Sequence, residues 1–351
     1  MYKIKDVLSI GNGRDYKHLS NGEIPVFGTG GYMTSVDECL YDGETTFIGR
    51  KGSINKPFYY NGKFWTVDTL FYTHSFNGIT PKFTYCLFQT INWLKYNEAS
   101  GVPSLSKDTI EKMKINIPGL EEQNKIAKLM FALDERIATQ NKIIDKLQSL
   151  IKGINQRVFM NNGINYKLGE ISEIRSGYSG NQLLSKKGLK VSRIETISGH
   201  KVNLERVGYV APFESSENYK LQVGDILFSN INSVEYIGNT AFIDKDYDLY
   251  HGMNLLRLTP NNMVVIPFYL YLLLNTNRML NRFKTVCNKA VSQASINQTE
   301  LGKTVVQIPN INAQKQICEL YQALYDKLES EKYANSLFQK QKQYLLRQMF
   351  I

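Results

Sequence analysis

The sequence is poor in the residues that build disulfide frameworks and zinc sites. Among 351 residues there are four cysteines and four histidines, and none stands in a CxxC or other metal-ligand spacing. They are Cys39, Cys86, Cys287, Cys318, His18, His74, His200 and His251. Their scatter excludes a disulfide scaffold and a zinc site of known spacing, and it favours the reducing cytoplasm.

Long hydrophobic runs are also absent. The longest strongly apolar stretch, 268–274, is far shorter than the roughly 20 residues that a membrane-spanning helix needs. The N-terminus, 1–6, lacks the apolar core of a signal peptide. With 42% hydrophobic residues the chain can still bury cores, so we expect a globular protein of two or three domains.

The motifs of the relevant enzymes are missing. Without a Pro-Pro pair the chain has no DPPY or NPPF tetrapeptide, and Thr29 replaces the first glycine of an F-x-G-x-G cofactor motif. Asn297 replaces the leading glycine of a phosphate loop that would end at 302–304. The one (D/E)-x-K triplet, 15–17, has no convincing acidic partner upstream. We therefore expect no catalytic site and no cofactor or metal on this chain.

What the chain does have is positive charge. It carries 42 Lys and Arg against 32 Asp and Glu, a net charge of +10, and the excess is spread along its whole length. A basic body suits contact with DNA phosphates, although a mildly basic protein without that role would show the same balance.

Five short segments of the first half recur in the same order in the second half, which indicates a tandem duplication. The pairs are 2–10 with 166–174, 22–26 with 188–192, 43–47 with 224–228, 81–87 with 267–273, and 117–126 with 308–317.

Each half predicts the same order of elements, an α+β fold. A β-rich stretch with turns at Asn12-Gly13, Asn21-Gly22 and Asn61-Gly62 precedes an apolar helix that begins at Pro81 or Pro267. A Ser/Gly/Val loop, a strand and a long helix follow. The predicted segments are two α+β domains, 1–118 and 162–309, and two helices, 119–161 and 310–351.

Both long helices carry a heptad pattern, which predicts that they pair as a coiled coil. A helix over about 120–158 would be roughly 58 Å long, comparable with about 17 base pairs of duplex. If the helices run antiparallel, a pseudo-two-fold arrangement places the domains at opposite ends; the alternative is that each helix packs on its own domain. The predicted seam is Ile126, Met130, Leu133, Ile137, Gln140, Ile144, Leu147, Ile151, Ile154 and Val158, with Ile317, Tyr321, Leu324, Leu328, Glu331, Asn335, Phe338, Lys342, Leu345 and Met349.

The second seam is weakened by Asn335 and Lys342, so we expect it to shift locally to Leu337 or Tyr344.

Three motifs make the chain resemble the specificity subunit of Type I restriction–modification enzymes. The segment 22–31 is similar to the family's G-x-I-P-V-x-G-x-G-G, and 224–229 with 237–242 is similar to its GDIL strand and the strand that follows. Most characteristic is the helix start at 117–127, I-P-x-L-x-E-Q-x-x-I-A, with a diverged copy at 308–317. The resemblance covers essentially the whole chain.

The resemblance implies two target recognition domains that each read half of a split DNA site, and two spacer helices that set the gap. It implies two methyltransferase subunits as partners, optionally restriction subunits, and adenine-N6 methylation with S-adenosylmethionine held by the partner. ATP and Mg²⁺ would belong to the restriction subunits. A non-catalytic coiled-coil scaffold and the reader of a related restriction complex are the alternatives.

One departure bears on the DNA site. The second half has Ser192-Arg-Ile194 where the first has the loop 28–31, and Asn230 stands where the family often has arginine. We therefore expect the two domains to read different sequences, which makes the site asymmetric.

The DNA-contact candidates are polar, basic and glycine residues on matching loops, because such groups read base edges and bind phosphates. For each, an ordinary turn or a solvated basic loop is the alternative; for the 22 tyrosines a place in the core is the default. The candidates are Thr29, Gly30, Gly31, Arg50, Lys51, Ser53, Ser100, Ser104, Ser192, Arg193, Asn230, Asn232, Ser233, Lys289, Ser292 and Gln293.

Overall fold

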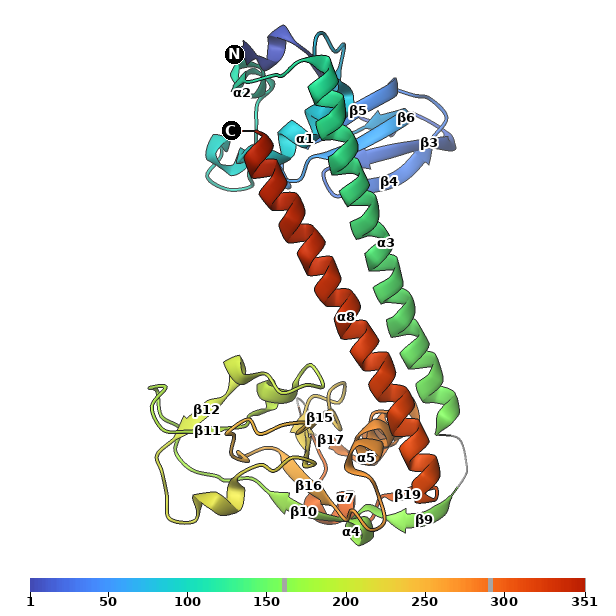
Figure 1. Cartoon of the computed structure of the whole chain (residues 1–351), viewed down its shortest axis with the longest axis vertical. Helices are drawn as coiled ribbons and strands as arrows, with labels where there is room; N and C mark the ends of the chain where they lie inside the picture. Colours follow the sequence, from blue (N-terminus) through green and yellow to red (C-terminus); the bar gives the residue numbers. More distant parts are fainter. Residues whose placement is uncertain (160–162, 290–292, 351) are drawn as a thin grey trace. The chain divides into compact units, whose positions relative to one another are not determined.

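The computed structural model describes residues 1–159, 163–289 and 293–350. The chain divides into two compact units, Met1–Ile143 with Glu331–Ile351, and Ile144–Ser330. Each unit contains an α+β domain and part of both long helices, α3 (Leu120–Val158) and α8 (Ile311–Met349) (Figure 1). The predicted segment limits at 118, 161 and 309 stay a prediction, because the units share the helices.

Unit 1 is built on a mostly antiparallel sheet of six described strands. Its order is β2 (Ser9–Asn12), β7 (Leu70–His74), β5 (Tyr41–Gly49), β6 (Phe58–Thr66), β3 (Asn21–Gly28) and β4 (Gly31–Val36). A separate short ladder joins β1 (Tyr2–Lys3) to β8 (Lys114–Ile115). Two of the predicted turns are wrong: Asn21 and Gly22 are the first residues of β3, and Asn61 and Gly62 lie inside β6, where Gly62 pairs with Gly43 on β5.

Helix α1 (Pro81–Thr90) covers this sheet, and α2 (Lys107–Lys112) follows it. Proline occupies the first position of α1 and Thr80 caps its N-terminus by accepting a hydrogen bond from the Phe83 amide. Phe83 and Phe88 are fully buried in the core, which explains why this apolar segment forms a covered helix rather than a surface one.

Unit 2 repeats the central part of this plan. Its main sheet has the order β10 (Ser172–Ser176), β16 (Leu256–Pro260), β13 (Ile226–Phe228) and β15 (Thr240–Phe242). The other described elements are β9 (Ile164–Lys167) with β19 (Val305–Ile308), β11 (Leu189–Val191) with β12 (Gly208–Val210), β14 (Ile231–Asn232) with β18 (Ala294–Ser295) and β17 (Asn288–Lys289), α4 (Leu168–Ile171), α5 (Pro267–Leu274), α6 (Asn277–Val286) and α7 (Gln298–Gly302).

The order β10-β16-β13-β15 matches β2-β7-β5-β6, and the pair β9–β19 matches β1–β8. α5 begins at a proline, as α1 does. The predicted duplication is therefore a duplication of the fold.

A buried glutamine fixes each long helix to its domain. Gln123 accepts a hydrogen bond from the Thr80 amide (2.8 Å) and donates to the carbonyls of Gly78 and Pro118 (both 2.9 Å). Both this side chain and its counterpart Gln314 are fully buried.

Gln314 repeats the pattern in unit 2. It accepts from the Ile266 amide (2.8 Å) and donates to the carbonyls of Val264 (3.1 Å) and Pro309 (2.9 Å). The glutamine of the I-P-x-L-x-E-Q motif thus satisfies backbone groups of two segments at once, because a primary amide is both donor and acceptor.

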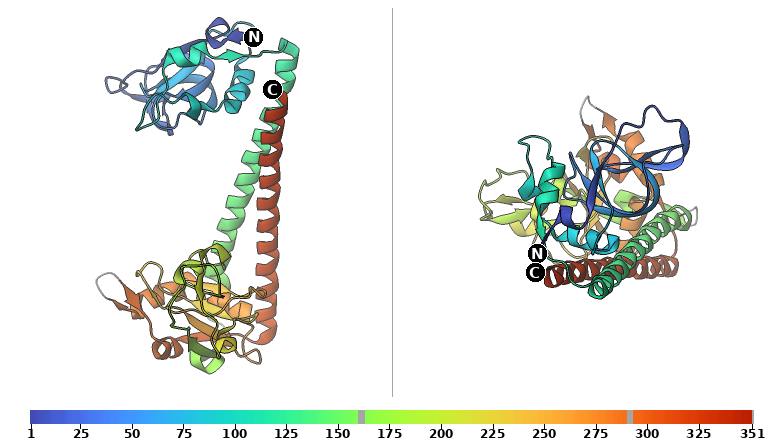
Figure 2. Two further views of the ribbon diagram at one scale, coloured as in Figure 1. Left: turned by 90° about the vertical axis from the view of Figure 1, so that its left-hand side faces the viewer. Right: turned by 90° about the horizontal axis from the view of Figure 1, so that it is seen from above.

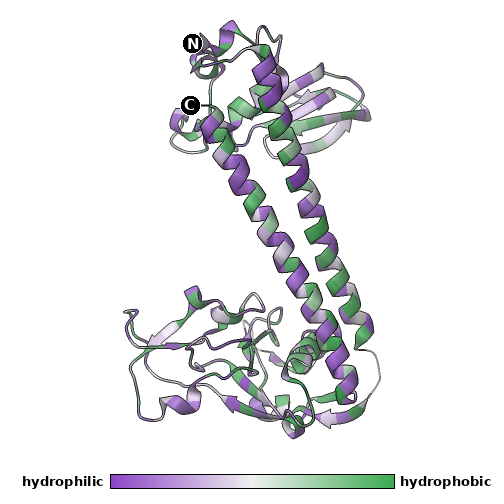
Figure 3. Ribbon diagram, in the orientation of Figure 1, coloured by the Kyte–Doolittle hydropathy of each residue, from purple (hydrophilic) through white to green (hydrophobic). Residues whose placement is uncertain are grey.

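In each unit the two long helices run antiparallel, and their apolar positions face each other (Figures 2 and 3). In unit 1, Met130 is fully buried in one cluster with Leu346. In unit 2, Tyr321 is almost fully buried, and its hydroxyl donates to Asn155 (3.3 Å). None of the described predicted seam positions on either helix is exposed.

Polar side chains of the second seam keep this register by finding partners within unit 1. Lys342 Nζ pairs with Asp134 and donates to Gln89 (2.7 Å). The expected shift to Leu337 or Tyr344 is wrong, since these side chains are 45% and 62% exposed.

A second polar layer contains two side-chain pairs between the helices. The Gln140 side chain donates a hydrogen bond to Glu331, and the Asn335 side chain donates one to Asn141 (2.8 Å). A shift in the register of the two helices would be destabilising, because these buried polar groups would then lose their partners. Within the described chain, neither long helix nor any other helix has the length and apolar character needed to cross a membrane.

Candidate nucleic-acid interface

The turn after β5 is held to a neighbouring loop through its backbone. The Leu105 amide donates to Arg50 O (2.9 Å), and the Gly52 amide donates to Pro103 O (2.8 Å). Gly52 has a φ of +86°, in the region that favours glycine. The predicted segments around Arg50 and Ser104 are therefore neighbours.

The β3–β4 hairpin joins the same surface. A Cβ placed on Gly52 would lie 3.6 Å from the Thr29 hydroxyl, so the hairpin tip is beside the turn. Gly31 has a φ of +103°, which explains a glycine there, whereas a Cβ on Gly30 would meet open space. The bare backbone at Gly30 leaves room for a ligand to approach closely.

The charges of this surface point outward. Arg50 and Lys51 are exposed, and the Arg50 guanidinium donates a long hydrogen bond (3.4 Å) to Asp68 O. Ser53 and Ser104 are half-buried, and Ser100 is exposed. The structure thus brings all the candidates of the first domain except Ser100 into one neighbourhood, where the guanidinium and ammonium groups can reach phosphates or base edges.

The second domain has the same backbone arrangement with other side chains. The Ile296 amide donates to Asn230 O (2.9 Å), as the Leu105 amide does to Arg50 O. Ile231 pairs with Ser295, as Lys51 bridges to Ser104. Asn230 therefore corresponds to Arg50, and the sequence match of 43–47 with 224–228 is one residue out of register here.

The asparagines of this turn have unequal roles. Asn232 donates to the Ser229 hydroxyl (3.1 Å) and accepts from the Ser233 amide (2.8 Å), so it stabilises its own turn. Asn230 has a buried Oδ1 with no hydrogen-bond partner among the described residues. Of the two, Asn230 is the one with bonding capacity to spare.

Ser192 is the candidate that the structure contradicts. Its side chain is fully buried and accepts a hydrogen bond from the Gly252 amide (3.0 Å), so it cannot reach a groove from this position. Arg193, the next residue, is exposed and lies 3.5 Å from Glu195.

A pocket of about 300 Å³ opens between the Ile194–Ser198 segment and the Ser229–Asn232 turn. Arg206 and Tyr236 also line it and are exposed, and neither was singled out from the sequence. Tyr236 follows the Ser229–Asn232 turn in the chain, whereas Arg206 comes from a separate segment that only the fold brings there.

The third loop of this domain is partly described. Gln293 is exposed and adjoins β18, which pairs with both β14 and β17. Lys289 lies in β17, and Ser292 lies outside the described residues.

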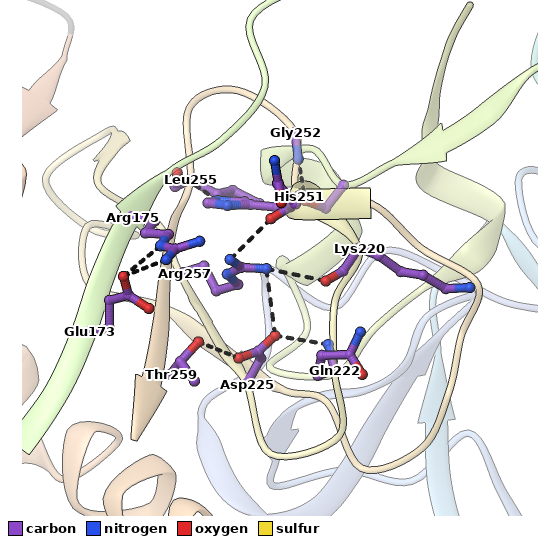
Figure 4. Close-up of polar contacts among 12 residues, drawn as sticks. Glu173, Arg175, Lys220, Gln222, Asp225, His251, Gly252, Leu255, Arg257 and Thr259 are labelled. Carbon is purple, nitrogen blue, oxygen red and sulfur yellow. Dashed lines mark hydrogen bonds and ion pairs between the residues drawn. The ribbon is translucent and has the colours of Figure 1, made fainter. Parts of the chain in front are cut away.

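A buried network supports β13, the strand that leads into the Ser229–Asn232 turn (Figure 4). Arg257 on β16 lies 4.0 Å from Asp225, which precedes β13, and donates to the carbonyls of Lys220 (3.1 Å) and Asn218 (3.2 Å). Asp225 also accepts from Thr259 (2.6 Å). The ion pair is buried and hydrogen-bonded on both sides, which is the arrangement that offsets the desolvation of two charges.

His251 lies in the same network, with Nε2 3.0 Å from Leu255 O. Burial, more than the nearby Arg257 charge, lowers its pKa to about 4, so the ring is neutral at pH 7. Among the described residues there is no cluster of three His, Cys, Asp or Glu side chains suited to a metal ion.

Comparison with known proteins agrees with this geometry. The family model for the Type I restriction modification DNA specificity domain matches residues 1–149 and 163–336. A protein of Methanocaldococcus jannaschii named as the MjaX specificity subunit is 43% identical over 150 residues, 42% of this chain and 35% of that protein. The MjaVIII specificity subunit of the same organism is 25% identical over 88% of this chain and 76% of its own length.

The EcoKI specificity subunit of Escherichia coli is 24% identical over 71% of this chain and 59% of that protein. Among solved structures, the S subunit of the Type I system of M. genitalium has a TM-score of 0.68 at 15% identity, covering 100% of this chain and 95% of that one. A chain from a study of assembly of the type I R-M system has a TM-score of 0.61 at 16% identity, with 99% and 96% covered. At these identities the structures show a common fold.

The chain therefore belongs to the Type I restriction–modification DNA specificity family. It is a specificity subunit, the class of protein that recognises DNA sequence for a restriction–modification system rather than catalysing a reaction.

Proposed function

We propose that this chain reads a bipartite, asymmetric DNA site and positions adenine-N6 methyltransferase subunits on it. The observation that carries the proposal is the repeated loop arrangement with unlike side chains. Arg50 and Lys51 in one domain correspond to Asn230 and Ile231 in the other. The same backbone arrangement with different hydrogen-bonding side chains suits two half-sites of different sequence.

The partners in this proposal are two methyltransferase subunits and, optionally, two restriction subunits. S-adenosylmethionine belongs to the methyltransferase, and ATP with Mg²⁺ belongs to the restriction subunits. The complex works in the cytoplasm, where its DNA is. The long helices serve as a spacer, so the number of heptads sets the gap between the half-sites.

The test is co-expression with the methyltransferase subunit, followed by sequencing of methylated adenines. We expect methylation at one bipartite asymmetric motif. Exchanging residues 1–118 for those of a relative should change one half of the motif; a change in both halves would rule out two independent readers.

The alternatives differ from this function in measurable ways. A coiled-coil scaffold would leave the assembled complex with equal affinity for cognate and scrambled duplex at matched salt. The reader of another type of restriction complex would retain specificity and differ in the genes that neighbour it.

A further inference from the structure

Unit 2 has a groove of about 520 Å³ between its domain and α8, which we name the aromatic groove. Five Phe and Tyr rings line it: Phe242, Tyr247, Phe268, Tyr271 and Tyr325. The centroid of the Phe268 ring lies 5.4 Å from that of Phe242 and 6.3 Å from that of Tyr325. The Phe268 ring is also stacked near that of Tyr271, so these rings form one aromatic cluster.

The rim of the aromatic groove is acidic. Asp244, Asp326 and Glu329 line it, against one lysine, Lys201, which is paired with Glu329 at 3.0 Å. The chain as a whole is basic, with a net charge of +10. An acidic rim disfavours DNA phosphates and favours a cation, so the groove suits a protein partner better than the nucleic acid.

Unit 1 shows what fills the same position in the other repeat. Phe131 lies eight residues after Gln123, as Gln322 lies eight after Gln314. The centroid of the Phe131 ring lies 5.6 Å from that of Tyr85, which is the counterpart of Tyr271. In unit 2 the smaller, polar Gln322 stands there instead and leaves the groove open.

In unit 1, lysine ammonium groups also lie over the aromatic rings. Lys82 Nζ lies 5.6 Å from the centroid of the Phe131 ring, and Lys342 Nζ lies 5.8 Å from that of Tyr85. Lys342 also pairs with Asp134. One repeat therefore covers its aromatic wall with its own ring and its own ammonium groups, which is an internal example of the chemistry that the aromatic groove offers.

We propose that the aromatic groove docks a basic segment of the methyltransferase subunit. An arginine or lysine side chain of that subunit lies over the Phe268 and Tyr271 rings and pairs with Asp244 and Asp326. The identity of the partner rests on the proposed function above; the cationic chemistry rests on the groove itself.

The decisive variant is Gln322→Phe, which gives unit 2 the residue of unit 1. It should fill the groove, keep or raise the thermal stability of the chain, and weaken binding of purified methyltransferase subunit by tenfold or more. Gln316→Phe, at an exposed position of the same helix outside the groove, is the matched control and should leave the affinity unchanged.

A second variant tests the charge. Asp244→Asn with Asp326→Asn should weaken the same binding about tenfold at low salt and reduce its salt dependence. Unchanged affinity in Gln322→Phe would overturn the proposal. Weakened binding in Gln322→Phe with none in the charge variant would show an occupant that is not cationic, and would overturn it too.

The readout separates this proposal from the proposed function. One outcome is that the wild-type chain binds the methyltransferase, that the complex recognises its DNA site, and that every variant behaves as the wild type does. In that case only the docking proposal fails. If Gln322→Phe weakens duplex binding alone, the groove contacts DNA and the docking proposal fails. If the wild-type chain and the methyltransferase do not associate, the proposed function fails and the docking proposal fails with it.

Discussion

Replacing Gln314 by leucine removes three hydrogen bonds without opening a cavity, since the two side chains are of similar size. The Ile266 amide and the carbonyls of Val264 and Pro309 lose their partner in a fully buried place. A net hydrogen bond contributes about 1 kcal/mol, and a buried group left unpaired costs about 1–3 kcal/mol. We therefore expect a loss of about 3 kcal/mol in the local stability of this joint.

Native-state hydrogen exchange is the appropriate assay, because unfolding of a two-unit chain is not a single two-state transition. The Ile266 amide is bound directly to Gln314 Oε1, so its exchange reports the joint. A loss of 3 kcal/mol corresponds to about 100-fold faster exchange, at 1.4 kcal/mol per factor of ten.

The control is Gln316→Leu, two residues further along on the exposed side of α8. It should leave the exchange of the Ile266 amide unchanged. Gln123→Leu should produce the same acceleration at the Thr80 amide in unit 1, with Asn124→Leu as its exposed control. The reasoning is refuted if Gln314→Leu and Gln316→Leu have equal effects, or if neither changes the exchange.

Three further predictions follow from the buried and exposed charges. Lys342→Met leaves Asp134 unpaired in a mostly buried place and should destabilise unit 1 by about 1–2 kcal/mol in thermal unfolding, after allowance for partial exposure. His251 has a pKa of about 4 when folded against 6.5 in the free side chain, so the unfolded chain binds its proton first. Its contribution makes stability fall by about 3 kcal/mol as the pH drops from 6.5 to 4, measured by urea denaturation across that range. Arg50→Ala should relax the base preference in one half of the methylated motif only, and Asn230→Ala in the other half only, read by sequencing of methylated adenines.

Each of these has an outcome that contradicts it. Adding Asp134→Leu to Lys342→Met should recover most of the stability, and a further loss would deny the pairing. His251→Asn should flatten the pH dependence between 6.5 and 4; an unaltered slope would assign it to other groups. A change in both halves of the motif on replacing Arg50 alone would deny that each domain reads its own half.

The order of the elements could be predicted from the sequence, because local and periodic patterns of residues encode it. Heptad spacing predicted α3 and α8 and their facing positions, and Pro81 and Pro267 marked the first residues of α1 and α5. The repeat was visible in short segments, since core positions and helix starts need similar residues in both halves. The turn signals at Asn21-Gly22 and Asn61-Gly62 failed, because these residues pair as parts of β3 and β6 and strand pairing outweighs the local turn preference.

The tertiary structure decided what each matching residue does. Glutamine 123 and 314 stood out as a motif, but only the fold shows that each joins a helix to a loop more than forty residues away in sequence. The sequence marked Ser192 as a reader, and packing against Gly252 buries it. Arg206 reaches the Ser229–Asn232 turn from an earlier segment, which no spacing predicts.

The sequence by itself therefore determined the duplication, the α+β class and the two long helices, because periodic burial and helix starts are encoded by neighbouring residues. Only the tertiary structure decided the register of the turns at Arg50 and Asn230, the burial of Ser192 and the open groove at Gln322. These features depend on contacts between segments that are far apart in the chain. There, the volume of one side chain or one hydrogen bond determines which side chain faces solvent.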